Sequence, residues 1–373
     1  MNSSDNLEQT IDSNQELMAF NNGILFDVKN NTYRDIEKGD FISKTMAIPF
    51  AEQLDAKATN AIYNIVSSFF EDPVITDYFL TVLGISLFTT KHEKLNILTG
   101  NGRNGKSLIM NYLNSILGDY ATVAESDLLT SKIRNGVSCS LVNARNTRVI
   151  LVSEPSSEDG KEVRLNNTLI KSITGNDRIT ARALYQNTIS FDPTFNVFML
   201  CNEIPSLEKV EKAMIERLNI IKFEFTFVGA EDVDKHPNNR LIDKDLKKTL
   251  KENLEMKQAF IQLLFKYAFA NLNKELRPPI ESIEAKEEYL EEIDDVKQFL
   301  EKFVIETGNA KDKVNMKVLY ETFKTHSRSD MVYRDFSKSL ERNGLTKMKS
   351  NGEYFIKNMK LKTQADEIEF IED

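Results

Sequence analysis

The sequence predicts an α/β protein: a core with a parallel sheet, flanked by helical segments and followed by a small C-terminal domain of helices and a hairpin. Three observations support this prediction. Between residues 94 and 228, short β-rich runs alternate with helical stretches, which is the pattern of a parallel α/β sheet. The first β-rich run leads into a glycine-rich loop and then into a helical pattern. After residue 293, three amphipathic segments precede two short strands around an Asn-Gly turn, the order of a winged-helix domain.

The chain divides into six segments along its length. Residues 18–50 alternate short apolar runs with Asn-Gly and Asn-Asn turn signals, so we expect a β-hairpin or meander. Between residues 54 and 90, apolar side chains recur at helical spacing, which predicts two or three helices. We expect an N-terminal β-rich segment (1–50), a helical collar (51–93), an α/β core (94–230), a helical segment with an acidic linker (231–292), a winged-helix domain (293–362) and an acidic tail (363–373).

Composition excludes several classes of protein. The 373 residues include 57 acidic side chains against 48 Lys and Arg, a formal charge of −9, which argues against a histone-like binder of nucleic acid. Cys139 and Cys201 are the only cysteines, too few for a disulfide framework or a cysteine-based zinc finger. The most apolar stretches are interrupted by polar residues, and the N-terminus lacks the pattern of a secretory signal. We therefore expect a soluble, cytoplasmic protein with no membrane partner.

Charge is distributed unevenly along the chain. Residues 281–295 carry eight acids and one base, whereas residues 296–362 carry fifteen Lys and Arg against eight Asp and Glu. The last eleven residues carry five acids and no base. The basic balance of the C-terminal domain favours contact with DNA phosphates over a purely solvated surface, and Lys347 and Lys349 on the expected wing are the candidate contacts.

The strongest motif is a phosphate-binding loop. It fits G-x-x-x-x-G-K-[ST], with the apolar run LNIL before it and a helical pattern after it. Glycines allow a tight turn whose N–H groups point at phosphate oxygens, and the following helix adds its dipole. Lys106 would then reach the β- and γ-phosphates of ATP, and Ser107 would ligate Mg²⁺. The candidate ATP-binding residues are Gly100, Asn101, Gly102, Arg103, Asn104, Gly105, Lys106 and Ser107.

Three further polar residues stand at the ends of expected strands. Glu154 follows the apolar run VILV, and it could polarise the attacking water or help to hold Mg²⁺ through water. Asn202 follows NVFMLC and could orient that water, although asparagine is also a common turn residue. Arg217 precedes LNIIKF; it could be a finger donated to a neighbour's phosphate or simply part of a surface ion pair.

In this order, the motifs resemble those of superfamily-3 helicases, specifically the poxvirus and phage or plasmid primase-helicase family. The matching segments are GNGRNGKS, VILVSEP, LIKSITGNDRITARALYQ, FDPTFNVFMLCNEIP and ERLNIIKFEF. With its flanking segments, the resemblance covers roughly residues 18 to 362. It implies an AAA+ type ATPase core and a C-terminal winged helix. It also implies an ATP-dependent replicative DNA helicase that forms hexameric rings and moves on single-stranded DNA, usually 3′ to 5′.

The resemblance also implies roles for individual residues. Lys106 and Ser107 would bind the nucleotide with Mg²⁺, and Glu154 would be the catalytic acid. Asn202 would be the first sensor, and Arg217 would be the finger acting across a subunit boundary. The superfamily adds a motif between acid and sensor that leads into a DNA-contacting hairpin, and this motif contains Lys171, Arg178 and Arg182. Expected partners are single-stranded and forked DNA, further copies of the chain, and a primase-polymerase domain or protein.

The sequence departs from the family pattern in two places. Arg103 stands where the loop more often has a small residue, and Glu154 follows Ser153 where many members have two acids. Mg²⁺ would therefore depend on Ser107, phosphates and water. Since no primase-polymerase domain fits before residue 18, we expect a helicase module, in the host cytoplasm if the source is viral.

Two other functions remain open on the sequence. A P-loop ATPase that loads a helicase would share the ATP motifs but would need no DNA-contacting hairpin. A winged-helix DNA-binding regulator with a weak ATPase would use the basic C-terminal domain, although the intact Lys106, Ser107 and Glu154 argue against it. DNA unwinding would exclude the first, and measurable ATP hydrolysis would exclude the second.

Overall fold

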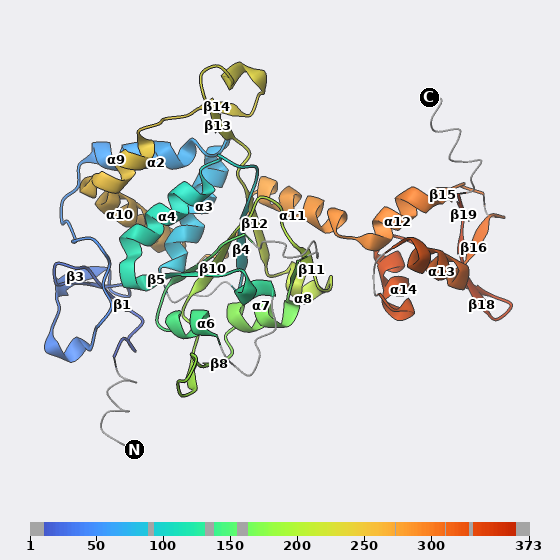
Figure 1. Cartoon of the computed structure of the whole chain (residues 1–373), viewed down its shortest axis with the longest axis horizontal. Helices are drawn as coiled ribbons and strands as arrows, with labels where there is room; N and C mark the ends of the chain where they lie inside the picture. The colour runs from blue at the N-terminus through green and yellow to red at the C-terminus, as the bar shows by residue number, and fades with distance from the viewer. Residues whose placement is uncertain are drawn as a thin grey trace. The chain divides into compact units, whose positions relative to one another are not determined.

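The computed structural model describes residues 11–88, 93–130, 138–154, 163–272, 274–309, 311–327 and 331–362. The expected acidic tail, residues 363–373, lies outside the described residues. The chain divides into two compact units, residues 1–286 and 287–373, and we describe each by itself. Their boundary falls within helix α11 (Ile280–Glu292; Figure 1), inside the stretch expected to hold the acidic linker. Among the described residues, no helix has the length and apolar character needed to cross a membrane.

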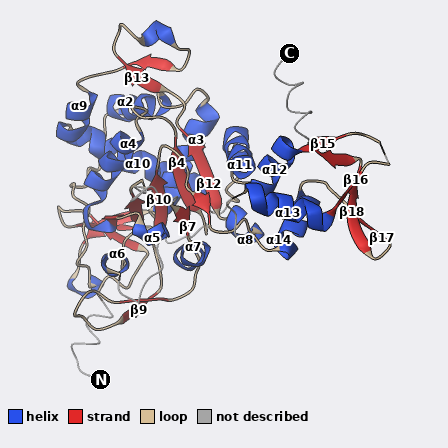
Figure 2. Ribbon diagram, turned by 45° about the vertical axis from the view of Figure 1, so that its right-hand side comes forward, coloured by secondary structure: helices blue, strands red, loops and turns tan. Residues whose placement is uncertain are grey.

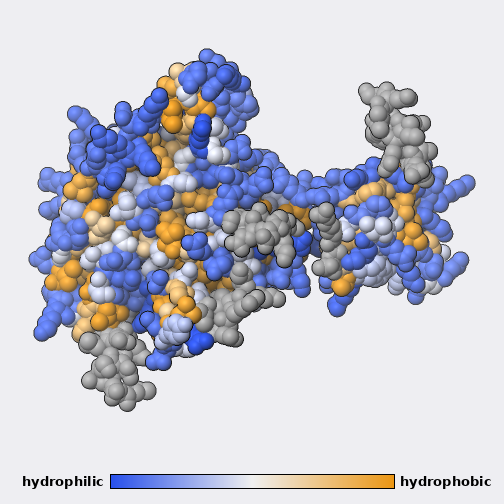
Figure 3. Space-filling model, viewed as in Figure 1, coloured by the Kyte–Doolittle hydropathy of each residue, from blue (hydrophilic) through white to orange (hydrophobic). Residues whose placement is uncertain are grey.

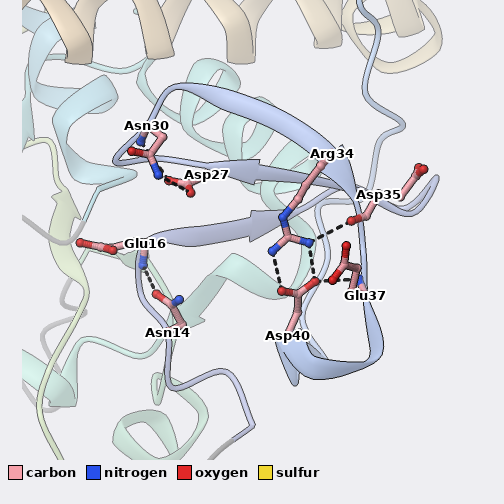
Figure 4. Close-up of polar contacts among 8 residues, drawn as sticks. All are labelled: Asn14, Glu16, Asp27, Asn30, Arg34, Asp35, Glu37 and Asp40. Atoms are coloured by element: carbon pink, nitrogen blue, oxygen red, sulfur yellow. Dashed lines mark hydrogen bonds and ion pairs between the residues drawn. The ribbon is translucent and has the colours of Figure 1, made fainter.

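An antiparallel meander begins the described chain, as its turn signals predicted. Its three strands are β1 (Leu17–Ala19), β2 (Ile24–Asp27) and β3 (Thr32–Asp35). Arg34 in β3 donates two hydrogen bonds from its guanidinium to Asp40, at 2.8 and 2.6 Å, which lowers the pKa of that carboxyl (Figure 4). At the turn between β2 and β3, Asp27 accepts hydrogen bonds from the backbone N–H and the side chain of Asn30. These polar contacts close both ends of the hairpin.

A five-stranded parallel sheet forms the centre of the first unit. Its strand order is β12-β4-β10-β6-β5. The strands are β4 (Leu95–Thr99), β5 (Ala121–Ala124), β6 (Val149–Val152), β10 (Asn196–Leu200) and β12 (Leu218–Lys222). The four apolar runs singled out in the sequence form four of these strands, and the edge strand β5 is the one that the sequence did not indicate. Because all five strands are parallel, their carboxyl ends meet at one edge of the sheet.

Helices cover both faces of this sheet (Figures 1 and 2). One face carries α2 (Ala56–Ser67), α3 (Pro73–Ser86), α4 (Lys106–Leu117), α9 (Leu246–Glu252) and α10 (Leu254–Asn271). The other carries α5 (Asp127–Thr130), α6 (Cys139–Asn143), α7 (Asn167–Thr174) and α8 (Lys212–Ile215). The first group shares one hydrophobic core with the sheet and with the meander, so the N-terminal strands are part of the same folded unit.

Short elements complete the first unit. They are β7 (Arg164–Leu165) with β11 (Ser206–Leu207), the hairpin of β8 (Ile179–Ala181) and β9 (Ile189–Phe191), the parallel pair β13 (Thr226–Val228) and β14 (Asn239–Leu241), and the 3-10 turns η1 (Lys38–Asp40), η2 (Gly118–Tyr120) and η4 (Val233–Lys235). The β8–β9 hairpin is the one expected between the Glu154 and Asn202 strands. On the face shown in Figure 3, apolar side chains are scattered among hydrophilic ones and form no single large patch.

A chain of buried amides crosses the sheet. The Tyr78 hydroxyl donates to Asn219 Oδ1 at 2.7 Å, and Asn219 Nδ2 donates to Asn96 Oδ1 at 2.8 Å. Asn96 Nδ2 then donates to the carbonyl of Val197 at 3.3 Å. Asn96 and Asn219 are both almost fully buried, and each has a partner for its amide, as burial of polar groups requires. Burial also raises the pKa of Tyr78, so its hydroxyl stays a donor.

After the end of α11, the described part of the second unit contains three helices and two small antiparallel sheets, β15-β19 and β16-β18-β17. The helices are α12 (Asp295–Phe303), α13 (Met316–His326) and α14 (Tyr333–Arg342), and the strands are β15 (Val304–Glu306), β16 (Lys313–Asn315), β17 (Lys347–Ser350), β18 (Glu353–Lys357) and β19 (Met359–Leu361). The three predicted helices and the predicted β17–β18 hairpin are present. Asn351 and Gly352 form its turn with φ of 50° and 82°, the positive values that a type I′ turn needs. Phe299, Phe323 and Phe336 meet in the core of this unit.

The close approach of α3 and α10 yields a test of the fold. A Cβ on Gly84 would stand 2.4 Å from the carbonyl oxygen of Leu264 in α10. We expect Gly84→Ala to lower the free energy of unfolding by about 1–3 kcal/mol, because the helices must move apart. Gly39→Ala is the matched control, since nothing lies within 4 Å of its Cβ position. Denaturant titration measures both, and equal stability of the two variants would contradict the close packing.

Candidate functional site

The glycine-rich loop connects strand β4, which lies between β12 and β10 in the sheet, to helix α4, as the motif predicted. It spans residues 100–105, between Thr99 at the end of β4 and Lys106 at the start of α4. Gly100 and Gly105 have φ of 129° and 91°, and Arg103 between them has φ of 62°. Two of the three positions need the freedom of glycine, and Arg103 is the exception that tolerates a left-handed backbone.

The loop rests on the segment that follows the edge strand β12. The side chain of Asn104 is buried and donates to the carbonyl of Phe223 at 3.3 Å. A Cβ on Gly100 would stand 2.2 Å from that same carbonyl oxygen. The backbone N–H of Phe227 donates to the carbonyl of Arg103 at 2.8 Å. The backbone of the loop is therefore held at Gly100 and Asn104 by Phe223 and at Arg103 by Phe227, while the Arg103 side chain is exposed.

A phenylalanine fixes the last glycine of the loop. A Cβ on Gly105 would stand 2.4 Å from the ring of Phe69, which follows helix α2. The ring of Phe69 itself packs against Phe223 and Phe227, with centroids 5.9 and 6.0 Å away. The aromatic cluster thus fills the space in which any larger residue at position 105 would have to fit.

Lys106 is buried and folds back over the loop. Its Nζ donates to the carbonyl of Gly100 and, at 3.4 Å each, to the carbonyl of Asn101 and to Asn202 Oδ1. Burial lowers the pKa of this ammonium group, and the nearby Cys201 and Glu154 oppose that shift. The partners of Nζ are neutral oxygen atoms, so the positive charge has no ion-pair partner among the described residues. An anion in the cavity could replace these neutral oxygen atoms as the partner of Lys106 Nζ.

Glu154 and Asn202 meet beside this lysine. The backbone N–H of Asn202 donates to Glu154 Oε1 at 2.9 Å, and Thr99 Oγ1 donates to the Asn202 carbonyl at 2.9 Å. The contacts follow from the sheet order, because β10 lies between β4 and β6 and the three strands end together. The glycine-rich loop, Glu154 and Asn202, which the sequence analysis identified separately, therefore lie together in one site.

A cavity of about 190 Å³ opens over these groups. It is lined by Lys106, Ser107, Asn111, Val123, Leu151, Val152, Ser153, Glu154, Leu200, Cys201 and Asn202. Sequence reasoning did not single out Asn111, Val123 or Cys201. Asn111 lies four residues after Ser107 on α4, a spacing that places both on one helix face and could have been noticed. Val123 belongs to the unpredicted strand β5, so the sequence offered no such signal.

Arg217 lies away from this cavity. It precedes β12, whose first residue Leu218 pairs with Leu95 at the start of β4, whereas the loop follows the end of β4. Five residues of strand separate the two points, ~16 Å at about 3.3 Å per residue. Arg217 instead contacts Glu93, at 3.3 Å, and the carbonyl of Ala213, at 2.9 Å. The structure does not bring Arg217 to the loop of its own chain.

The three cations of the hairpin motif have different surroundings. Lys171 lies on α7 and forms a 2.6 Å ion pair with Glu211, which lowers the pKa of that carboxyl. Arg178 donates to the carbonyl of Ser190 at 3.3 Å and braces the β8–β9 hairpin. Arg182 follows β8, and its carbonyl accepts the N–H of Ser138. Beyond it, the hairpin tip is exposed and presents two large side chains, Leu184 and Tyr185, to solvent.

The two wing lysines belong to the second unit. Lys347 Nζ lies 2.9 Å from both Glu341 and Ser337 Oγ, and the hydrogen bond with Glu341 raises its pKa. Lys349 is exposed, with its Nζ 5.9 Å from the centroid of the Tyr354 ring. Of these two candidate phosphate contacts, Lys347 already has a carboxylate partner.

The chain is similar to a family of unknown function and to putative helicases of large DNA viruses. Residues 98–217 match a family described as "Family of unknown function (DUF5906)". The "Putative helicase L207/L206" of Acanthamoeba polyphaga mimivirus is 30% identical over 333 residues, which cover 87% of this chain and 34% of that protein. The "Putative helicase 121R" of Invertebrate iridescent virus 3 is 27% identical, over 84% of this chain and 35% of that protein. The chain thus spans about one third of the length of these curated relatives.

A solved structure resembles most of the chain in fold. It is described as the apo structure of the NrS-1 C terminal region, with a TM-score of 0.51, 12% sequence identity, and coverage of 93% of this chain and 83% of that one. At this identity the likeness concerns the fold alone. It supports the mixed α/β architecture with its central parallel sheet.

The cysteine at the cavity yields a chemical test. Burial raises the pKa of Cys201 to about 12, and Glu154 adds to the shift. At pH 8 only ~10⁻⁴ of Cys201 would be thiolate, the reactive form. We expect iodoacetamide to label the exposed Cys139 and to spare Cys201 in the folded protein, as read by peptide mass spectrometry. Both should react after denaturation. Equal labelling rates in the folded protein would contradict the assigned burial.

Proposed function

We propose that this chain is the motor module of an ATP-dependent DNA helicase of superfamily 3, which assembles as a homo-oligomeric ring, a hexamer. One observation carries the proposal: the phosphate-type loop, Asn202 and Glu154 follow three adjacent parallel strands, and Glu154 and Asn202 line one cavity together with Lys106 and Ser107, which directly follow the loop. Lys106 is buried there and has no ion-pair partner among the described residues. The putative helicases of large DNA viruses that are similar to the chain support the same class.

ATP is the proposed substrate of the cavity. Lys106 would exchange its loop carbonyl partners for phosphate oxygens, a charge-assisted contact that is stronger than the present neutral ones. Glu154 would accept the proton of the attacking water, and Asn202 would orient that water. Ser107, exposed at the first turn of α4 and bordering the cavity, fits the role of protein ligand to Mg²⁺. The metal would neutralise charge on the phosphates, with Glu154 acting on it through water.

The place of Arg217 supports a site shared between subunits. About 16 Å of strand separates it from the loop of its own chain. This span exceeds the reach of one arginine side chain, so a finger role requires a neighbouring copy. In a ring, each Arg217 would serve the γ-phosphate that the next subunit binds, in the manner of other arginine fingers.

DNA contact is proposed for both units. The β8–β9 hairpin ends shortly before the Asn202 strand β10 in sequence and presents an exposed tip, with Arg182 directly after β8 and Tyr185 further along the tip. Lys171 and Arg178 would support the hairpin rather than touch DNA first, because each already has a partner. The second unit would act as a winged helix, with Lys349 as the freer of the two wing cations. Single-stranded and forked DNA are the proposed partners, with 3′ to 5′ movement.

The remaining proposals concern the cell. The chain would work with a primase-polymerase domain or protein, as the resemblance to primase-helicases implies. Its place of action would be the cytoplasm of the host, if the source is a virus.

Hydrolysis and unwinding can be tested together. We expect Mg²⁺-dependent ATP hydrolysis that single-stranded DNA stimulates, and strand displacement on a forked DNA. Lys106→Ala should abolish both. Glu154→Gln should still bind a fluorescent ATP analogue but hydrolyse ATP at least about a hundredfold more slowly, since it loses the proton acceptor. Glu203→Gln is the matched control, because that exposed carboxylate follows Asn202 and does not line the cavity. ATP hydrolysis without strand displacement would favour a helicase loader instead.

Sharing of the site can be tested by mixing subunits. Arg217→Ala should bind ATP but hydrolyse it ~10³-fold more slowly. Mixing it with Glu154→Gln chains should restore activity, because some sites then combine an intact Glu154 with an intact Arg217. The control replaces the Glu154→Gln chain by one that carries both substitutions, and it should give no rescue. Wild-type turnover by Arg217→Ala, or full activity in a proven monomer, would contradict the trans finger.

A further inference from the structure

Glu93 joins two parts of the proposed motor that the sequence keeps far apart. Its Oε2 accepts a hydrogen bond from the Arg217 guanidinium at 3.3 Å. Its Oε1 accepts one from the side-chain amide of Asn176 at 3.1 Å. Asn176 lies in the short loop between α7 and β8, three residues before the hairpin strand begins. One carboxylate therefore connects the arginine before β12 to the base of the β8–β9 hairpin.

Arg217 is folded against its own chain. The side chain of Arg217 is only 20% exposed, and a second nitrogen donates to the Ala213 carbonyl at 2.9 Å. A finger that reaches a neighbour's phosphate must extend from the surface, and its charge must be free to meet the phosphate. Here the charge is compensated by Glu93, whose carboxylate would also repel a phosphate at close range.

The hydrogen bonds of the Arg217 guanidinium are also incomplete, so Arg217 does not have the environment of a purely structural arginine. Arg217 Nε is buried and has no hydrogen-bond partner among the described residues, and such a donor costs free energy in the folded state. Glu93 has a φ of 50°, a left-handed backbone conformation that is unfavourable for this residue type. The Glu93 side chain is 46% exposed, so the ion pair is accessible to water and contributes little to stability. These features describe a contact that can open at low cost.

We propose that Glu93 is a positioning residue that holds Arg217 in a parked state, and that displacement of Asn176 by DNA on the hairpin weakens this hold. The inference rests on the proposed function, because it takes Arg217 as the finger and the hairpin as the DNA contact. It adds a route by which DNA binding in one subunit controls ATP hydrolysis at the boundary with the next. When the hairpin moves, Asn176 leaves Oε1, the carboxylate is no longer oriented, and the guanidinium extends toward the neighbouring subunit.

Chemical accessibility of Arg217 tests this hold without relying on ATP hydrolysis. Phenylglyoxal modifies exposed guanidinium groups, and peptide mass spectrometry reads the rate at Arg217. We expect Glu93→Gln and Glu93→Ala to raise this rate at least about fivefold, the lower end of typical coupling between sites. Glu216→Gln is the matched control, since it removes an equal charge beside Arg217 and pairs with Lys212 instead. An unchanged rate in both Glu93 variants would overturn the proposal.

The DNA arm of the same experiment tests the hairpin link. Oligo(dT) should raise the rate of Arg217 modification in the wild-type chain, and Asn176→Ala should raise the rate without DNA and remove most of the DNA effect. No response to oligo(dT) in a chain that binds it would overturn the link between hairpin and arginine.

ATP hydrolysis then separates a parked arginine from one that Glu93 orients for catalysis. We expect Glu93→Gln to hydrolyse ATP about fivefold faster than wild type without DNA, with a smaller stimulation by DNA. Adding Arg217→Ala to Glu93→Gln should abolish this gain. A slower rate with unchanged DNA stimulation would overturn the parked state in favour of an orienting role. If instead the wild type hydrolyses no ATP, the proposed function fails, and the phenylglyoxal rates still decide whether Glu93 shields Arg217.

Discussion

The carbonyl of Phe223 is the contact on which the candidate site depends. It accepts the Asn104 amide, and it leaves no room for a side chain on Gly100. The carbonyl follows edge strand β12, so the loop has its conformation only when β12 is paired with β4. The Phe223 ring packs against Phe70, which lies between α2 and α3, and against Phe79 on α3, with centroids 4.8 and 5.6 Å away. The shape of the loop is thus a product of the tertiary packing as well as of its glycines.

The same packing explains why the helical segment before the sheet matters to the site. Phe69 supports Gly105, and α3 holds the buried amides through Tyr78. α10, far along the chain, closes this layer by packing at Gly84. The glycine-rich motif alone supplies the residues proposed to bind phosphate. The cavity beside it also depends on helices that come before and after the motif in the sequence.

Much of the fold could be predicted from sequence because its signals are local. The apolar runs of β4, β6, β10 and β12 and the Asn351-Gly352 turn carry their own structural preference, and a parallel arrangement places Glu154, Asn202 and the loop at the same end of the strands. Their direct contact also depends on the strand order, which the sequence did not indicate. Strand β5, at the sheet edge, has a short and partly exposed sequence and gave no signal. The contacts of Arg217 and Asn176 with Glu93 could not be predicted, because 124 and 83 residues separate the partners and neither pairing leaves a periodic pattern.

The buried Asn96–Asn219 pair has a consequence for the geometry of the whole sheet. An apolar pair at these positions would tolerate a slip of β12 along β4, at a cost in packing only. A slip of one residue would turn the Asn219 amide to the opposite face and leave Asn96 without its partner. The hydrogen bond between the two amides therefore specifies the register of β12 against β4. They fix the register of β12 on β4 and with it the separation between Arg217 at one end of the sheet and the glycine-rich loop at the other, which is the distance that the proposed assembly of copies would have to match.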